Sequence, residues 1–408
     1  MNLRLDPARE AWMSAAPTRA VIQALNRDGG AARFVGGAVR DALIGRQVSD
    51  IDIATPLEPE QVIQRLRSAG LNAVPTGIAH GTVTAIAFGK PFEVTTLRRD
   101  VATDGRRAIV AYTTNWAEDA ARRDFTINAI YAAEDGALFD PAGGIADLEA
   151  GRVRFIGDAR QRIREDYLRI LRFFRFHAWY AKGAPDRLAL DAARHEKDGL
   201  AKLSGERVRK ELLRLLAAKT CLPSLRAMQD AEILPAVLPE AKSLRRLERL
   251  TAIEDGEGIV ADPILKLASL LNGRDDALRV AERLRLSNAE KERLADACGG
   301  DAIAESHDER AARALVYRFG NARASDRILL AWAADENPDP ANWRARFSLA
   351  RSWPRPAFPL HGQDVLAAGI AEGAEVGRIL AKLEEWWIAE DFAPTREDLL
   401  AELKQRRG

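Results

Sequence analysis

The sequence predicts an α+β protein in which a mixed head is followed by an all-helical remainder. Short apolar runs, separated by stretches with helical periodicity, fill the first 150 of the 408 residues. After residue 150 the strand signals stop, and apolar residues recur at spacings of three and four, which is typical of amphipathic helices. The hydrophobic fraction of 47% is ordinary for a globular protein, so a substantial core is expected.

The expected elements follow one another along the chain. In the head, strands are predicted at ARFVGG, SDIDIAT, GTVTAIAF and PFEVTTL, and helices near 38–45, 58–69 and 116–123. In the remainder, helices are predicted at 164–181 and 205–218, and linkers at 335–343 and 352–359. We therefore divide the chain into four predicted parts: a head (1–150), a neck (151–226), a body (227–335) and a tail (336–408).

Bulk properties exclude several classes of protein. The two cysteines, Cys221 and Cys298, cannot form a disulfide framework or a cysteine-based zinc site, and they suit a reducing compartment. The first residues lack the apolar region of a signal peptide, and no run of about 18 apolar residues predicts a membrane span. A cytoplasmic protein without membrane segments is therefore expected.

Positive charge is concentrated in the predicted neck, although the net charge of the chain is only +1. Residues 151–180 carry eight arginines against three acids, and residues 201–226 carry seven basic residues against two acids. Such stretches fit either solvated helix faces or a local surface that binds a polyanion.

Two aspartates alternate along the predicted strand SDIDIAT. Side chains at i and i+2 point to the same face of a strand, so Asp50 and Asp52 are expected to converge. Paired carboxylates repel each other unless a cation lies between them, and Mg²⁺ takes carboxylate oxygens while leaving positions open for phosphate. The spacing therefore predicts a metal site, and acids on an exposed strand edge are the alternative.

Upstream, the motif VGGAVRD (35–41) closes a predicted strand and opens a helix. Gly36 and Gly37 allow backbone N–H groups to approach an anion, and Arg40 could contact a phosphate. A plain tight turn is the alternative, and the third glycine of a dinucleotide-binding motif is missing. A phosphate cradle and a carboxylate pair so close together indicate metal-assisted phosphoryl or nucleotidyl transfer.

Metal-assisted transfer of this kind calls for a third acidic residue, and Glu93 is the candidate. It alternates with Phe92 and Val94 in KPFEVTTLR, so it lies on the opposite face of a predicted strand. It could approach the two aspartates if the strands are neighbours. An acid on an edge strand is the alternative.

The order and spacing of these motifs resemble a known family. GGAVRD, eight residues and DID are followed by RRDFTINAI (122–130), DPAGGIADL (140–148) and REDYLRILRFFRF (164–176). The series is similar to that of the bacterial class II CCA tRNA nucleotidyltransferases, in the polymerase-β-like nucleotidyltransferase superfamily that also holds the bacterial poly(A) polymerases. The resemblance covers the first 240 residues strongly and the tail weakly. It implies a polymerase-β-like nucleotidyltransferase head, with a small mixed sheet and helices, followed by a helical neck, body and tail.

The resemblance also implies roles for residues of the head. By it, Asp50 and Asp52 hold Mg²⁺, Gly37 and Arg40 contact the triphosphate, and Arg123 binds the incoming nucleotide. The residues implied to shape or support these sites are Gly36, Asp41, Asp124 and Asn128. The segment 98–112 corresponds to the flexible loop that family members use when they switch from C to A addition.

In the neck, the resemblance implies a helix that recognises bases and binds phosphates. The matching residues are Asp166, Arg169, Arg172 and Arg175, with Glu165 steadying Arg169. The residues themselves allow this role, because helical spacing places Glu165, Asp166 and Arg169 on one side. Asp166 can accept from an amino group and Arg169 can donate to the adjacent ring nitrogen, an edge shared by cytosine and adenine. Surface salt bridges are the alternative.

We therefore expect an enzyme that adds CCA to tRNA 3′ ends from CTP and ATP, with Mg²⁺ as its cofactor. The expected partner is tRNA, held through its acceptor and TΨC arms by phosphates and shape. A poly(A) polymerase and a partial enzyme that adds only CC or only A are the alternatives within this class. An inactive tRNA-binding protein is a further alternative, which the intact Asp50 and Asp52 disfavour. The sequence leaves the oligomeric state open.

Overall fold

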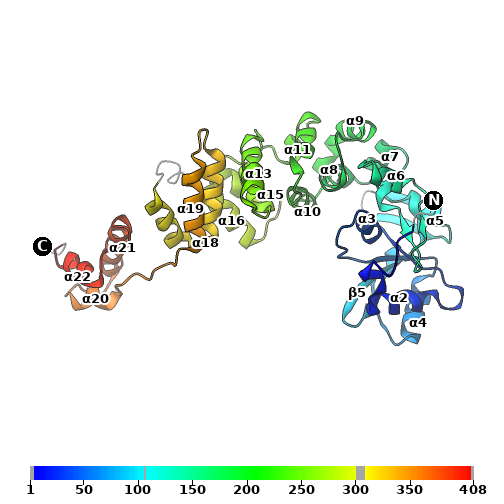
Figure 1. The fold of residues 1–408 in the computed structure, drawn as a ribbon, viewed down its shortest axis with the longest axis horizontal. Helices are drawn as coiled ribbons and strands as arrows, with labels where there is room; N and C mark the ends of the chain where they lie inside the picture. Colours follow the sequence, from blue (N-terminus) through cyan, green and yellow to red (C-terminus); the bar gives the residue numbers. More distant parts are fainter. Residues whose placement is uncertain (1–3, 105–106, 300–307, 406–408) are drawn as a thin grey trace. The chain divides into compact units, whose positions relative to one another are not determined.

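The chain forms two compact units in a computed structural model that describes residues 4–104, 107–299 and 308–405 (Figure 1). The units are Met1–Pro239 and Glu240–Gly408. The first holds all the strands of the described chain, and the second is helical. The predicted α+β class, with a mixed head before helices, is confirmed. The finer division into head, neck, body and tail stays a prediction.

A seven-stranded mixed sheet forms the centre of the first unit, in the order β3-β4-β5-β2-β1-β8-β9. Only β2 and β5 pair in parallel; the other neighbours are antiparallel. The strands are β1 (Arg33–Val35), β2 (Asp52–Thr55), β3 (Asn72–Gly77), β4 (Thr82–Ala87), β5 (Lys90–Thr96), β8 (Tyr131–Ala132) and β9 (Leu138–Phe139). The four predicted strands correspond to β1, β2, β4 and β5.

Two further strands form a separate antiparallel ladder, β6 (Arg98–Asp104) with β7 (Arg107–Tyr112). The segment 98–112, which the resemblance implies to be a flexible loop, contains both of these strands, and residues 105–106 between them lie outside the described chain; its role in switching from C to A addition stays a prediction. We call it the β6–β7 hairpin. The strands β3, β8 and β9 were also not predicted, because β3 is largely exposed and the other two contain two residues each.

Helices cover the sheet at places where the sequence predicts them. The three predicted helices of the head are confirmed as α3 (Gly37–Leu43), α4 (Pro59–Ser68) and α5 (Trp116–Ala121). The start of α4 is fixed by Pro59 in its first turn and by a capping box between Glu58 and Gln61. The other helices here are α1 (Ala11–Ser14), α2 (Ala16–Asn26) and α6 (Gly144–Glu149). Helices α2 and α4 pack on each other and on the sheet (Figure 1).

The predicted helix over 164–181 is wrong at Asp166, where the chain breaks into two helices. Helix α7 (Ala159–Glu165) ends there, because Asp166 has extended backbone angles (φ −156°, ψ 107°). Its side chain accepts from the N–H of Leu168 (3.1 Å), the first residue of α8 (Leu168–Tyr180). Aspartate favours this arrangement because its short side chain competes for backbone N–H groups at helix starts. The unit continues with α9 (Arg187–His195), α10 (Gly205–Leu216), α11 (Cys221–Asp230) and α12 (Ile233–Val237).

The second unit packs its helices around two buried regions. Its described helices are α13 (Arg245–Glu257), α14 (Pro263–Ser269), α15 (Arg274–Arg283), α16 (Asn288–Cys298), α18 (Glu309–Ala334), α19 (Pro340–Ser352), α20 (Gly362–Ala367), α21 (Ala374–Ala389) and α22 (Arg396–Gln405). In one region the stacked rings of Trp332 and Trp343 join α18 to α19. The predicted linker 335–343 is too long, because Asp339 caps α19 and Pro340 starts it. No described helix is both long and apolar enough to cross a membrane.

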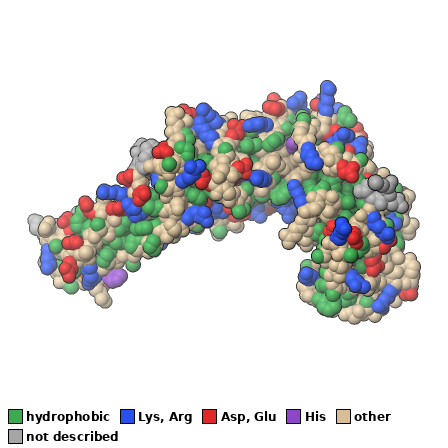
Figure 2. All heavy atoms as spheres, viewed as in Figure 1, with side chains coloured by type: hydrophobic (Ala, Val, Ile, Leu, Met, Phe, Trp, Pro, Cys, Tyr) green, Lys and Arg blue, Asp and Glu red, His purple; other side chains and the backbone are tan. Residues whose placement is uncertain are grey.

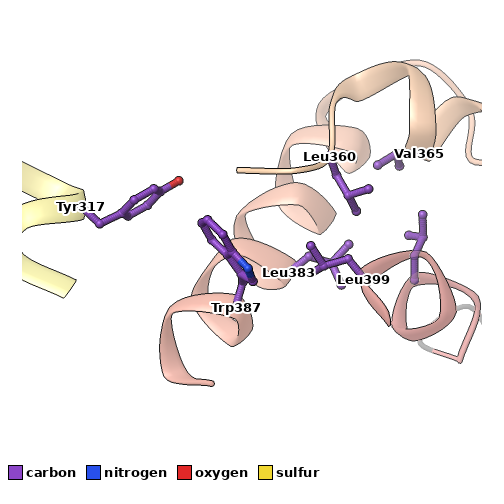
Figure 3. Packing of buried hydrophobic residues seen from close by; sticks show 7 residues of the cluster. Tyr317, Leu360, Val365, Leu383, Trp387 and Leu399 are labelled. Carbon is purple, nitrogen blue, oxygen red and sulfur yellow. The ribbon is translucent and has the colours of Figure 1, made fainter. Parts of the chain in front are cut away.

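The other buried region joins the last three helices to the first half of α18. Its core contains Tyr317, Leu360, Val365, Leu383, Trp387, Leu399 and Leu403. In Figure 3 the Tyr317 ring points toward Trp387, and the ring centroids are 5.5 Å apart. Tyr317 lies before a break in α18 at Gly320, whose φ of +77° favours glycine.

Candidate active site

A cavity of about 530 Å³ in the first unit collects most of the predicted site residues. It is lined by Gly36, Gly37, Arg40, Asp41, Asp50, Asp52, Arg123, Asp124, Asn128, Asp166, Arg169 and Arg172. Three lining residues were not predicted: Ser49, Phe176 and Arg214. The remaining predicted residues, Glu93, Glu165 and Arg175, lie outside this lining. Residues more than 170 positions apart therefore meet around one space rich in arginine and aspartate.

The glycine motif forms a sharp turn from β1 into α3, as predicted. Gly36 has φ +69° and ψ −122°, a backbone conformation that side-chain-bearing residues rarely adopt. The turn places Arg40 deep in the cavity wall, where its side chain is only 8% exposed. Its guanidinium donates to Asn128 Oδ1 (2.5 Å), Tyr180 OH (2.7 Å) and Asp41 Oδ1 (3.0 Å). Arg40 is therefore held in one orientation by residues from separate segments.

The two aspartates line the same cavity, although they do not share a strand as predicted. The strand β2 begins only at Asp52, which lies opposite Val35, the last residue of its antiparallel partner β1. Asp50 therefore belongs to the preceding loop. Burial raises the pKa of Asp52, and the charges of Glu93 and Asp50 raise it further against the opposing effect of Arg123. The local environment thus favours a positive charge beside Asp52.

Glu93 lies on β5, the strand next to the one that carries Asp52. The sequence allowed Glu93 to approach the aspartates only if these two strands are neighbours, and they are. The parallel pairing of β2 with β5 sets Asp52 directly opposite Glu93. Within the described ranges, however, no group of three or more His, Cys, Asp or Glu side chains is arranged to hold a metal ion. The role of Glu93 as a third carboxylate stays a prediction.

A second cavity, of about 650 Å³, shares Ser49, Asp50 and Asp52 with the first. Its other walls come from α1, α2, β4 and β5, and include Trp12 and Lys90 as well as Glu93. The ring of Trp12 packs edge-on against Phe34, with centroids 5.0 Å apart. The two aspartates thus line both spaces.

The segment 122–128 is fixed by two buried carboxylates. Asp124 Oδ2 accepts from Arg172 Nε (2.7 Å), and Asp124 Oδ1 accepts from Asn128 Nδ2 (2.9 Å). Although burial alone raises the pKa of Asp124, the charge of Arg172 and the bond from Asn128 hold it at about 2. Arg123 is paired with Asp119, a residue that the sequence did not single out. The i,i+4 spacing of these two residues in a predicted helix was the signal that could have found it.

The neck residues form ion pairs around the break between α7 and α8. Arg169 donates to Glu165 Oε2 (2.5 Å) and to the carbonyl oxygen of Arg162 (2.7 Å), so the predicted contact with Glu165 is present. Asp166 pairs instead with Arg207 of α10 (2.7 Å), which the sequence did not single out. Arg207 could not be found by local spacing, because 41 residues separate it from Asp166. Arg175 faces Glu211 (2.6 Å) rather than the cavity.

Acids neutralise much of the positive charge of the neck. All eight arginines of 151–180 lie within an ion pair, and their partners are Asp124, Asp147, Glu165, Glu196 and Glu211. Four of these acids lie outside residues 151–180, so the count of acids within that stretch did not include them. Figure 2 shows basic and acidic side chains interspersed on the face in view. The stretch is therefore less of a free cationic surface than its composition indicates.

Family models match two parts of the chain. Residues 32–154 match the Poly A polymerase head domain, and residues 188–244 match the probable RNA and SrmB-binding site of polymerase A. The chain is 35% identical over 384 residues to the mitochondrial CCA tRNA nucleotidyltransferase 1 of Mus musculus, covering 91% of this chain and 86% of that protein. It is 29% identical over 387 residues to the CCA-adding enzyme of Latilactobacillus sakei, covering 94% and 96%.

Solved structures have the same fold. The CCA-adding enzyme of Bacillus stearothermophilus in complex with CTP is similar with a TM-score of 0.72 and 25% identity, covering 96% of this chain and 97% of that one. The Thermotoga maritima CCA-adding enzyme complexed with tRNA gives a TM-score of 0.70 at 21% identity, over the full length of both chains. The similarity thus extends through both units.

Proposed function

The chain belongs to the family of CCA-adding tRNA nucleotidyltransferases, and from this membership we propose that it adds the 3′-terminal CCA sequence to tRNA from CTP and ATP. One observation carries the proposal: the two aspartates line the same cavity as four arginines, Arg40, Arg123, Arg169 and Arg172. Arginines suit the triphosphate, and the aspartates suit the cation that accompanies it. Similarity over nine-tenths of the chain supports tRNA as the acceptor.

In the proposed reaction, the 3′-hydroxyl of the tRNA loses its proton to solvent, and its oxygen forms a bond to the α-phosphorus of the nucleotide. The bond from that phosphorus to the bridging oxygen breaks, and pyrophosphate leaves. Arg40 and Arg123 bind and orient the triphosphate, so that the α-phosphate faces the hydroxyl. The second cavity receives the RNA end, because it reaches Asp50 and Asp52 from another side. The tRNA nucleotide thus approaches the aspartates without competing for the triphosphate pocket.

Members of this enzyme class are generally metal-dependent, and we propose Mg²⁺ at Asp50 and Asp52. Both are hard oxygen donors that line the two cavities. Burial raises the pKa of Asp52, and the charges of Glu93 and Asp50 raise it further, effects that a bound cation would oppose. When bound, Mg²⁺ lowers the pKa of the attacking hydroxyl and stabilises charge on the phosphates. We also place the reaction in the cytoplasm, which the two free cysteines support.

Base choice is proposed to rest on Asp166 and Arg169. Asp166 accepts from Arg207 and from the N–H of Leu168, which leaves lone pairs for an amino group of cytosine or adenine. Arg169 is held by Glu165 and by a backbone carbonyl, so its orientation is set before a nucleotide arrives. A fixed donor beside a fixed acceptor selects C and A over U and G.

The products formed on a tRNA without its CCA end test this function. With CTP and ATP together, the enzyme should add three nucleotides and stop. Long adenosine tracts with ATP alone would instead favour a poly(A) polymerase, which the match of residues 32–154 to a polymerase head keeps as the second candidate. Stopping after two cytidines, or adding only the last adenosine, would show a partial enzyme.

Replacing Asp50 or Asp52 by asparagine tests the role of the pair. We expect transfer to fall by about a thousandfold or more, because a metal ligand acts on the transition state, while tRNA binding stays nearly unchanged. Asp158→Asn is the matched control, since Asp158 caps α7 outside both cavities. Single-turnover incorporation within about tenfold of the parent enzyme would remove the aspartates from the mechanism.

A further inference from the structure

The carboxylate of Asp119 joins groups that belong to separate parts of the head. It is only 1% exposed and lies on α5. Asp119 Oδ2 accepts from Arg123 Nε (3.2 Å), Arg123 Nη2 (3.1 Å) and Tyr131 OH (2.8 Å). Asp119 Oδ1 accepts from Arg122 Nε (2.8 Å). Arg123 lines the cavity, but Asp119 does not, so the carboxylate acts on the site only through its partners.

The same carboxylate also reaches the β6–β7 hairpin. The backbone N–H of Arg98, the first residue of β6, donates to Asp119 Oδ1 at 3.3 Å. Just before the hairpin, Leu97 is fully buried in a core that also contains Ala120 of α5 and Tyr131 of β8. One end of the hairpin is thus attached to the residue that holds Arg123.

The arrangement is electrostatically suited to fixing Arg123. Burial alone would raise the pKa of Asp119, but the charges of Arg123 and Arg122 and the bond from Tyr131 hold it below its ordinary value. Asp119 therefore stays ionised in a low-dielectric environment, where charge-assisted bonds are strongest. Tyr131 OH also accepts from Arg123 Nε (3.2 Å), and this closes a three-membered network.

We propose that Asp119 is a positioning residue that sets the orientation of Arg123 toward the nucleotide and anchors the β6–β7 hairpin to the same carboxylate. Nucleotide binding and the position of the hairpin are thereby coupled: displacement of Arg98 disturbs the carboxylate that orients Arg123, and the reverse holds equally. The proposal rests on the proposed function, in which Arg123 binds the triphosphate.

Asp119→Asn tests the proposal, with Asp147→Asn as its matched control. Asp147 is also buried (3% exposed), and it accepts from Thr126 Oγ1 (2.7 Å) and Arg154 Nε (3.0 Å), but it does not line the cavity. Asp119→Asn should weaken CTP and ATP binding by about tenfold or more, because it removes a buried charge-assisted contact to Arg123. Asp147→Asn should leave nucleotide binding within about threefold of the parent, despite a similar loss of stability.

Three measurements separate positioning from a merely structural role. Direct titration with CTP gives binding without requiring transfer, so that loss of the proposed function and loss of this proposal remain distinguishable. Steady-state kinetics should show a rise in KM larger than the fall in kcat. Hydrogen exchange at the Arg98 amide should be faster in Asp119→Asn than in the parent, and CTP binding should slow it in the parent but not in the variant.

Equal nucleotide affinities for Asp119→Asn and Asp147→Asn would overturn the proposal. Unchanged exchange at Arg98 would overturn the link to the hairpin. If Asp119→Asn does not fold, Tyr131→Phe decides, since it removes one hydroxyl from the network and keeps the ring in the core. Tyr131→Phe should raise KM for both nucleotides by a few-fold, roughly what one neutral hydrogen bond provides. An unchanged KM in this variant counts against the proposal.

Discussion

At the scale of single side chains, the choice of base is proposed to depend on Arg169 and Asp166. Arg169 is held by Glu165 and the carbonyl of Arg162, so its loss should leave the cavity without a donor for cytosine N3 or adenine N1. In Arg169→Ala, selectivity for C and A over U and G should relax by about ten- to a hundredfold, since such a pair is worth roughly 1–3 kcal/mol. The measurement is kcat/KM for each of the four nucleotides on one tRNA.

Arg164→Ala is the control for that experiment, because Arg164 pairs with Glu196 outside the cavity. It should leave the four ratios as they are. If Arg169→Ala weakens all four nucleotides equally, Arg169 binds phosphate and base choice lies with another residue.

Asp124 should make stability depend on pH in the acid range. Its pKa in the folded chain is about 2, below its ordinary value of 3.8, so its contribution is complete above the ordinary value and is lost as the pH falls. The shift corresponds to about 2 kcal/mol at neutral pH, of which about half should be lost by pH 3. Urea denaturation of the parent and of Asp124→Asn at pH 7, 5 and 3 measures this difference. A gap in unfolding free energy that stays constant with pH would contradict the assignment.

Among elements, the turn between β1 and α3 has a backbone conformation that favours glycine, because Gly36 has φ +69° and ψ −122°. A Cβ on Gly36 would meet no atom closer than 3.9 Å, so only its positive φ opposes substitution. Gly36→Ala should therefore cost about 1–3 kcal/mol in stability. Because the turn aims Arg40 into the cavity, we also expect weaker nucleotide binding. Gly45→Ala is the control, since Gly45 has a similar φ of +68° and open space around it, just after α3. If both variants bind CTP with the affinity of the parent, the turn only links β1 to α3 and has no role in nucleotide binding.

The sequence was sufficient for elements whose signal is local. Periodicity located α3, α4 and α5, and alternation located the strands that carry Asp52 and Glu93. It failed in two places. Strand β2 starts at Asp52, opposite the end of β1, rather than at Ser49. The helix predicted over 164–181 breaks at Asp166, whose backbone is extended and whose side chain accepts from the N–H of Leu168. Most site residues could be named from motifs. Partners such as Arg207 could not, because their contacts depend on how distant helices pack.

At the scale of the whole molecule, every residue that lines the cavity proposed to bind the nucleotide lies in the unit Met1–Pro239. CTP should therefore stabilise that unit and leave Glu240–Gly408 nearly unaffected. At a CTP concentration about a hundred times its Kd, the expected gain is about 2.7 kcal/mol. Hydrogen exchange of the full chain with and without CTP measures protection in each unit. Equal protection in both units would show that nucleotide binding also acts on the second.

The break in α18 at Gly320 has a consequence for anyone who recombines this chain with a relative. The first half of the helix belongs to the last three helices, because Tyr317 enters their core and Arg313 pairs with Asp391 (2.7 Å). The second half stacks Trp332 on α19. In a chimaera joined after residue 335, Tyr317 and Arg313 would therefore pack against a C-terminal segment from another protein, whose surface does not match them. A crossover placed before Glu309 transfers the segment together with its complementary surface.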